Sequence, residues 1–120
     1  MATILVVEDN LHNLKLAQLV LQKAGHAVLP AGSGEDGLRI AGEQLPDLIL
    51  MDVQMPGKDG LAITRLLKQA PKTAHIKVVA LTALAMKGDA ERILAAGCDA
   101  YLAKPYHYND LIAVVDRALA

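Results

Sequence analysis

Asp52 is the acidic residue around which the rest of the sequence can be arranged. It directly follows Asp47–Met51, whose continuous apolar residues are typical of a strand that is buried on both faces. Pro56-Gly57 and Asp59-Gly60 come next and indicate a loop, which leaves the carboxylate at the carboxyl end of the strand. A charge at that depth must be paired or serve a function.

Polar residues also follow three other runs that favour strands. Ile4–Val7 is continuous, apolar and rich in β-branched residues, Ile76–Leu81 is a similar run, and Asp99–Ala103 is a shorter one. In a parallel sheet the carboxyl ends of the strands meet at one edge, so the side chains that follow these runs are expected to lie near Asp52. They belong to Glu8, Asp9, Thr82 and Lys104.

Helices are predicted between the strands. Asn10 and Ser33 are suitable capping residues, Gly25 suits the position after a helix, and Pro71 stops one. The predicted helices run from Leu11 to just before Gly25, from Ser33 to about Gln44, from about Leu61 to Gln69, from about Met86 to Ala96, and from a cap at Asn109 nearly to Ala120.

This alternation of strands and helices predicts the fold. His26–Ala31 is a further strand candidate, and its Pro30 belongs at a sheet edge because proline cannot donate to a ladder. Five strand-helix units in strict alternation indicate an α/β fold with a doubly wound parallel sheet. Right-handed crossovers and the edge-type strands favour the flavodoxin-like order 2-1-3-4-5. With 120 residues and 53% hydrophobic content, one domain over residues 1–120 is expected.

Composition excludes several classes of function. The formal net charge is -1 and the basic residues are dispersed, so binding to nucleic acid or to a membrane surface is not expected. The single Cys98 cannot form an internal disulfide, and no signal peptide or membrane-spanning run is present, which favours the cytoplasm. The histidines and the cysteine lack the spacing of a zinc site.

The clustered acids predict a phosphoryl-transfer site. Three carboxylates within a few ångströms repel one another unless cations lie between them. Lys104 can supply one positive charge, and Mg²⁺ can supply the other, because Mg²⁺ binds through one or two carboxylates and completes its shell with water and phosphate oxygens. A carboxylate can itself accept a phosphoryl group. Asp52, central in the predicted sheet, is the expected nucleophile.

Over essentially its full length the sequence resembles the response-regulator receiver domains of two-component signalling. The matching features are Glu8-Asp9 after ILVV, Asp52 in LILMDVQMPGKDG, Thr82 in VVALTA and Lys104-Pro105 after AYLA. The segment AMKGDAERILAAGCDAYLAKP is similar to single-domain receivers of the cell-division-control type (DivK-like), and equally to the receivers at the end of hybrid histidine kinases.

The resemblance implies a role for each site residue. Asp52 is implied to be the phosphoacceptor, and Thr82 and Lys104 to contact the phosphoryl oxygens. Asp9, Asp52 and the backbone carbonyl of Gln54 are implied Mg²⁺ ligands, with Glu8 acting through water. The resemblance further implies a cis bond before Pro105, and Tyr101 as an aromatic side chain that turns inward on activation.

The resemblance to receiver domains also implies partners. A histidine kinase or a phosphotransfer protein is expected to donate the phosphoryl group, and a downstream protein to read the changed surface. Self-phosphorylation and autodephosphorylation are the only chemistry expected, by a monomer or weak dimer.

Leu84 offers no acid or amide to orient a water, which predicts a long-lived phosphoryl group. No output domain follows the fifth helix, so output is expected through another protein unless the chain is an excised receiver.

Other functions fit less well. An aspartyl phosphatase usually needs a second acid near its nucleophile, and Asp52-Val53-Gln54 provides none. A nucleotide site lacks the Gly-Lys-Ser/Thr phosphate loop. A constitutive, unphosphorylated interaction module remains open. Structural roles also remain open for Thr82, as a local hydrogen-bonding partner of the backbone, and for Tyr101, as a packed residue of an edge strand. Leu16, Leu19 and Val20 could either pack against neighbouring elements or dock a kinase.

Overall fold

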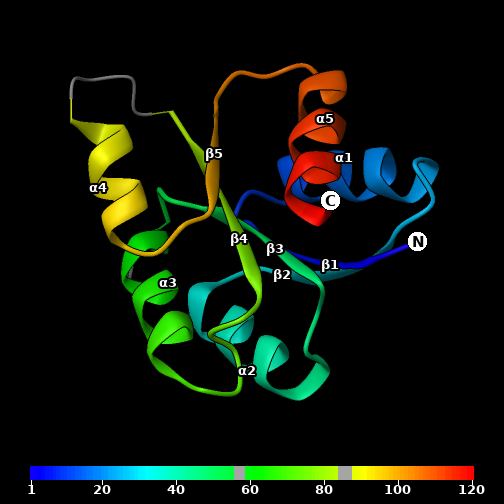
Figure 1. Cartoon of the computed structure of the whole chain (residues 1–120). Helices are drawn as coiled ribbons and strands as arrows, with labels where there is room; N and C mark the ends of the chain where they lie inside the picture. Colours follow the sequence, from blue (N-terminus) through cyan, green and yellow to red (C-terminus); the bar gives the residue numbers. More distant parts are fainter. Residues whose placement is uncertain (56–58, 84–87) are drawn as a thin grey trace.

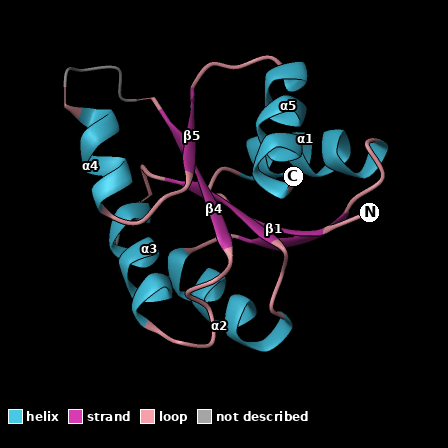
Figure 2. Cartoon of the chain, viewed as in Figure 1, coloured by secondary structure: helices cyan, strands magenta, loops and turns pink. Residues whose placement is uncertain are grey.

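The computed structural model describes residues 1–55, 59–83 and 88–120, in which strands and helices alternate along the chain (Figures 1 and 2). The strands are β1 (Thr3–Val7), β2 (Ala27–Ala31), β3 (Leu48–Asp52), β4 (Lys77–Thr82) and β5 (Ala100–Ala103). The helices are α1 (Leu11–Lys23), α2 (Gly34–Gln44), α3 (Gly60–Gln69), α4 (Asp89–Ala95) and α5 (Tyr108–Leu119).

All five strands are parallel and form one sheet in the order β2-β1-β3-β4-β5. The predicted flavodoxin-like order is therefore confirmed, with the Pro30 strand at one edge. Val7 pairs with Met51, Asp52 with Leu81, and Thr82 with Ala103. This register brings the carboxyl ends of β1, β3, β4 and β5 to the same edge of the sheet.

Two layers of helices bury the two faces of the sheet (Figure 1). Alternate strand residues point to opposite faces, so Ile4 and Leu50 pack with α1 and α5, whereas Leu5 and Ile49 pack with α2, α3 and α4. Every residue of β3 is buried. The continuous apolar runs therefore reflect strands that are covered on both sides.

Side-chain caps begin several helices. The side chain of Asn10 accepts a hydrogen bond from the Asn13 backbone N–H at 3.0 Å, as predicted. The predicted cap at Asn109 is wrong: Asn109 lies inside α5, and His107 is the capping residue. Asp110 explains the earlier start, because its carboxylate accepts the His107 backbone N–H at 3.3 Å. The predicted start of the fourth helix at Met86 lies outside the described residues.

Two further observations concern the chain as a whole. The Lys104-Pro105 peptide bond is cis, in agreement with the resemblance. Among the helices that the structure describes, none has both the length and the apolar character needed to cross a membrane.

Candidate functional site

Three carboxylates converge where β1 and β3 end. Glu8, Asp9 and Asp52 each place a carboxylate oxygen within 4.8 Å of the other two. The side chains of Glu8 and Asp52 are only 4% and 3% exposed, whereas Asp9 is exposed to solvent. The structure thus brings together the three acids that the sequence placed at this edge, and it buries two of them.

Lys104 reaches this cluster from the end of β5. Its Nζ lies 3.1 Å from Glu8 Oε1 and 3.3 Å from Asp52 Oδ1. The Lys104 backbone N–H donates to the Thr82 carbonyl at 2.7 Å, which fixes the end of β5 beside the end of β4. Burial alone would lower the pKa of Lys104, but the attraction of the two carboxylates outweighs it and the pKa is raised. The side chain is therefore an ammonium ion at neutral pH.

The crowding of the carboxylates changes the pKa of Glu8. Burial, followed by the hydrogen bond and the negative charge of Asp52, raises the pKa of Glu8, and Lys104 opposes this only in part. One ammonium group faces three carboxylates, so the described site carries an excess of negative charge. An all-oxygen donor set with that excess fits a hard divalent cation such as Mg²⁺.

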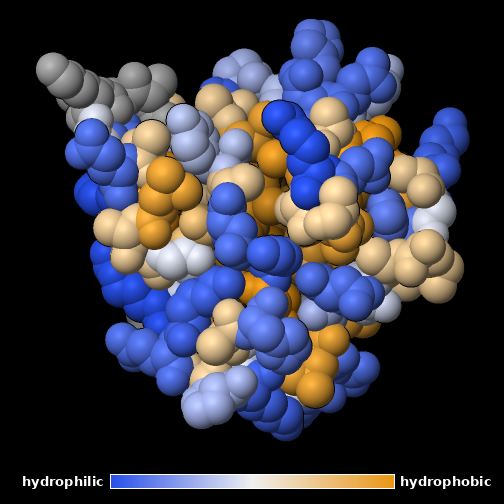
Figure 3. Space-filling model, in the orientation of Figure 1, coloured by the Kyte–Doolittle hydropathy of each residue, from blue (hydrophilic) through white to orange (hydrophobic). Residues whose placement is uncertain are grey.

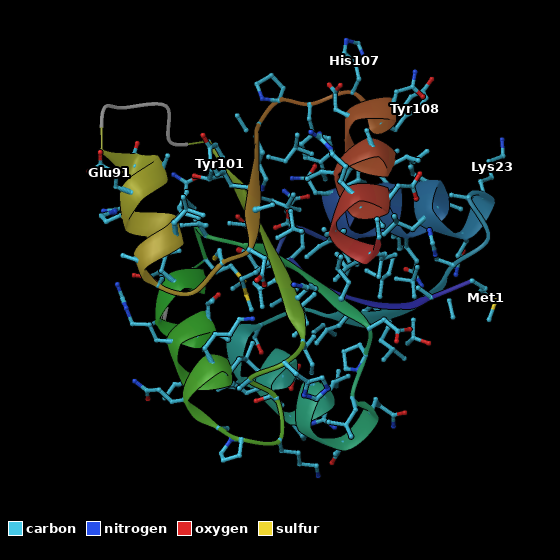
Figure 4. All side chains as sticks on the ribbon, viewed as in Figure 1. Met1, Lys23, Glu91, Tyr101, His107 and Tyr108 are labelled. Carbon is cyan, nitrogen blue, oxygen red and sulfur yellow. The ribbon has the colours of Figure 1, made fainter. Side chains whose placement is uncertain are left out.

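Thr82 at the end of β4 and Tyr101 within β5 have different surroundings. Thr82 is buried at the end of β4, beside Ala103 of β5. Tyr101 is 45% exposed and lines a groove of about 530 Å³ between α4 and α5. Figure 4 shows it beside β5, on the side of α4, and Figure 3 shows apolar side chains at the surface between α4 and α5. Edge-strand packing therefore does not describe Tyr101 here, and its inward turn stays a prediction.

Gly60 fixes the backbone of Asp52, a role that sequence reasoning missed. Its N–H donates to the Val53 carbonyl at 3.1 Å, at the start of α3. A Cβ added at this position would overlap the Asp52 carbonyl oxygen and lie 2.9 Å from Met51 Cγ. The sequence Asp59-Gly60 gave a loop signal, whereas the structure uses Asp59 as the helix cap and Gly60 for close approach to Asp52.

Gln54 contacts two parts of the site. Its backbone N–H donates to Asp52 Oδ1 at 3.1 Å, and its side-chain Oε1 accepts the backbone N–H of Ala83 at 3.2 Å. The second hydrogen bond was not predicted, because a contact 29 residues away along the chain leaves no local pattern. The predicted role of the Gln54 carbonyl toward a metal stays a prediction.

The outer surface of α1 is the other feature left open by the sequence. Leu16 and Leu19 are exposed, so simple packing against neighbouring elements is wrong for these two, whereas Val20 packs against the core. Leu16 and Val20 line a groove of about 360 Å³ between α1 and α5, which also includes Lys104 and Tyr106. Leu84, on which the prediction of a long-lived phosphoryl group rests, lies outside the described residues.

The raised pKa of Glu8 predicts how stability depends on pH without metal. Between the ordinary pKa of 4.5 and the raised value, the folded state binds more protons than the unfolded state. The free energy of unfolding should therefore fall as pH rises through this interval. Glu8→Gln should remove that slope and make the metal-free protein more stable than the wild type at pH 7, as measured by urea unfolding in chelator.

Glu43→Gln is a matched control, because Glu43 is exposed and forms an ion pair with Arg39 on the surface of α2. It should leave the slope unchanged. A Glu8→Gln variant that is less stable than the wild type at pH 7 in chelator would show that the Lys104 contact outweighs the burial of Glu8.

Comparisons with known proteins agree with this geometry. The sequence model of the response regulator receiver domain matches residues 4–116. The polar-differentiation response regulator DivK of Brucella ovis is 46% identical over 117 residues, which is 98% of this chain and 95% of that protein. The DivK proteins of Brucella suis and Brucella abortus match equally well.

Solved structures place the fold in the same group. The chemotaxis protein CheY4 of Vibrio cholerae superposes with a TM-score of 0.94 at 26% identity, covering 99% of each chain. The receiver domain of a sensor histidine kinase from Pseudomonas aeruginosa, solved with a magnesium ion in its active-site cleft, superposes with a TM-score of 0.90 at 36% identity, covering 98% of this chain and 97% of its own. The chain therefore belongs to the response regulator receiver domain family and is a signalling module of two-component systems rather than a classical enzyme.

Proposed function

We propose that Asp52 is the phosphoacceptor and that a phosphohistidine of a histidine kinase or phosphotransfer protein is the donor. The observation that carries this proposal is the placement of Asp52, a buried carboxylate in contact with Lys104 and beside two further acids. Burial excludes bulk water, and the neighbouring lysine can neutralise charge on a phosphoryl group attached at this position.

The transfer forms one bond and breaks one. A carboxylate oxygen of Asp52 bonds to phosphorus while the P–N bond of the phosphohistidine breaks, and the electron pair remains on the imidazole nitrogen. Lys104 keeps its proton and supplies positive charge to the phosphoryl oxygens. Thr82, at the neighbouring strand end, donates its hydroxyl hydrogen to another of these oxygens. In later hydrolysis water attacks phosphorus, the P–O bond to Asp52 breaks, and inorganic phosphate leaves the restored Asp52 carboxylate.

Asp9, Asp52 and the Gln54 carbonyl would hold Mg²⁺, with Glu8 acting through water. The fit rests on the donor set, in which three carboxylates lie together and, among the residues that the structure describes, one ammonium group balances their charge only in part. When bound, the ion supplies Lewis acidity toward phosphoryl oxygens. The exposure of Asp9 gives it access from solvent.

Phosphorylation then switches a protein-binding surface. The added charge and acceptor oxygens at Asp52 bias an equilibrium between two conformations, in which Thr82 moves toward the phosphoryl group and Tyr101 turns inward from its exposed position. A full shift from 1:99 to 99:1 needs about 5.5 kcal/mol of differential stabilisation. The output is the altered binding of a downstream protein.

The chain is proposed to act as one receiver domain over residues 1–120, in the cytoplasm, as a monomer or weak dimer. Its similarity to DivK supports a stand-alone regulator, and its similarity to the receiver of a sensor histidine kinase supports a place in a phosphorelay. In both settings Asp52 performs the same chemistry, so the proposal does not depend on the choice.

Incubation with acetyl phosphate tests the chemistry directly. The wild-type protein should gain the mass of one phosphoryl group in the presence of Mg²⁺ and none in chelator, because the excess carboxylate charge repels the donor when no metal is bound. Asp52→Asn should gain none under either condition. Intact-mass spectrometry measures all four samples.

An adduct of equal yield on Asp52→Asn would place the phosphoryl group elsewhere and contradict the assignment. No adduct on a folded wild-type protein that binds Mg²⁺ would favour the alternative function, a constitutive interaction module in which Asp52 is structural.

A further inference from the structure

Positive charge is concentrated in one segment of the chain, residues 53–88. This segment contains six of the twelve lysines and arginines but only one of the thirteen acids, Asp59. Its formal charge is therefore +5, whereas the remainder of the chain carries -6. The net charge of -1 is the balance of two regions of opposite sign, and each region has its own electrostatic field.

The fold places the exposed part of this segment on one side of the molecule. Most of its exposed residues that the structure describes lie on α3 and in the turn that follows. Helix α3 lies on the same face of the sheet as α2 and α4, whereas α1 and α5 cover the other face (Figure 1). Lys68 and Lys77 are paired with Asp99. Arg65 is exposed and forms no ion pair with any residue that the structure describes.

A groove of about 500 Å³ between α3 and α4 combines this charge with apolar side chains. Val53, Met55 and Leu61 are buried residues that line it, so its floor is apolar. Arg65 of α3 and Arg92 of α4 also line it, and the Arg92 side chain is 58% exposed. Because a guanidinium group matches the geometry of a carboxylate, the groove is suited to an apolar side chain with carboxylates beside it.

The acids near the groove leave its arginines available. Asp59 lines the groove, but its Oδ1 accepts the Ala62 N–H at 2.8 Å as the cap of α3. Asp89 Oδ1 lies 3.9 Å from Arg92 Nη2, which is a long ion pair. Because a guanidinium group has five N–H donors, this contact leaves most of them free for a ligand. Among the described residues that line the groove, two cations therefore accompany a single carboxylate that is already hydrogen-bonded.

We propose that the groove between α3 and α4 binds an acidic segment of a partner protein. An apolar side chain of that segment lies on Met55 and Leu61, and its carboxylates contact Arg65 and Arg92. This inference goes beyond the proposed function and holds with or without a phosphoryl group on Asp52. The groove between α1 and α5 is on the opposite face of the sheet, so it stays free for a second protein.

A protein suits this surface better than nucleic acid does. The remainder of the chain carries -6 and repels a long polyanion, whereas an acidic segment of a folded protein approaches only the groove. The apolar floor also gives a phosphate backbone nothing to bind, but it can bury an apolar side chain.

A peptide titration tests the surface. The peptide Glu-Glu-Leu-Glu-Glu, blocked at both ends, is added to the isotope-labelled full chain and followed by NMR. Shifts should be confined to α3, α4 and residues 53–55. The dissociation constant should rise with salt, because exposed charges are screened. Replacement of the leucine of the peptide by serine should raise it about tenfold, because the apolar floor is then left uncovered.

Charge reversal identifies the arginines involved. Arg65→Glu and Arg92→Glu should each raise the dissociation constant about tenfold, the loss expected for one hydrogen bond between charged groups. Arg39→Glu is the matched control, because Arg39 is 57% exposed on α2 and lies outside the groove. It changes the net charge equally and should leave binding unchanged. The double variant of Arg65 and Arg92 should prefer a peptide with lysine in place of glutamate.

Loss of binding in both groove variants, with normal binding in Arg39→Glu, supports the inference. Equal losses in all three variants would show that the peptide responds only to net charge, and the absence of saturable shifts at millimolar peptide would show that no site exists. Either result overturns the inference, as does duplex DNA that displaces the peptide from the same residues. None of these measurements involves phosphorylation, so their failure would leave the proposed function of Asp52 intact.

Discussion

Gly60→Ala should lower the free energy of unfolding by about 3 kcal/mol, the upper end of the usual cost of overpacking. The added methyl group would occupy the space of the Asp52 carbonyl oxygen and press on Met51 Cγ at 2.9 Å. Neither neighbour can move freely, because both belong to the central strand and are buried on both sides. Urea unfolding monitored by circular dichroism measures the loss.

The same substitution should impair phosphorylation more than its effect on stability alone explains. Displacement of the Asp52 backbone moves its carboxylate away from Lys104 Nζ, 3.3 Å away in the wild type. A shift of about 1 Å in a reacting group can cost on the order of a hundredfold in rate. Intact-mass spectrometry with acetyl phosphate, at a temperature where the variant is folded, measures this.

Gly42→Ala is the matched control for Gly60→Ala. Gly42 lies inside α2, and a Cβ there would meet nothing within 4 Å. Because alanine favours helix, this change should raise the free energy of unfolding by about 0.5–1 kcal/mol. Opposite signs for the two substitutions would attribute the Gly60 effect to contact with Asp52. A Gly60→Ala protein as stable as the wild type would contradict the close approach.

The sequence predicted the main elements and the site acids because both depend on local patterns. Continuous apolar runs such as Ile4–Val7 mark strands covered on both faces, and in a parallel sheet their ends must meet. Glu8, Asp52 and Lys104 could therefore be assigned to one edge of the sheet from the sequence alone. The structure places the carboxylates of Glu8 and Asp52 3.1 and 3.3 Å from Lys104 Nζ.

The features that could not be predicted from the sequence depend on long-range contacts and on detailed geometry. The hydrogen bond from Ala83 to Gln54 depends on how the chain leaves β3 and β4, and the requirement for glycine at position 60 depends on how closely α3 approaches β3. The cap of α5 is His107 instead of the predicted Asn109, because the Asp110 carboxylate accepts the His107 backbone N–H and the helix begins earlier. The exposure of Tyr101 depends on the packing of α4 and α5 around the edge strand.

Lys104→Met should destabilise the metal-free protein by about 3 kcal/mol, because removal of one partner leaves buried charge without compensation. Glu8 and Asp52 are almost fully buried, and Lys104 Nζ contacts both. The raised pKa of Lys104 gives the pH range: its contribution is complete below the ordinary value of 10.5 and is lost as pH rises through the folded value. The difference between wild type and variant should therefore persist from pH 7 to about pH 10 in urea unfolding experiments in chelator.

Mg²⁺ distinguishes the role of Lys104 in folding from its role in transfer. A divalent cation can neutralise the carboxylates that the variant leaves unpaired, so Lys104→Met should bind Mg²⁺ more tightly than the wild type and recover most of its stability. Phosphorylation should not recover with it. The ammonium group acts on the phosphoryl oxygens, and loss of such a contact costs about a hundredfold in rate.

Lys77→Met is the control for both measurements, because its ion pair with Asp99 at 4.0 Å is exposed and worth at most about 1 kcal/mol. A Lys104→Met protein that regains both stability and phosphorylation in Mg²⁺ would show that Lys104 only balances the charge of the acids. Recovery of stability alone would show that the metal and the lysine neutralise the same carboxylates in the resting protein but serve different oxygens during transfer.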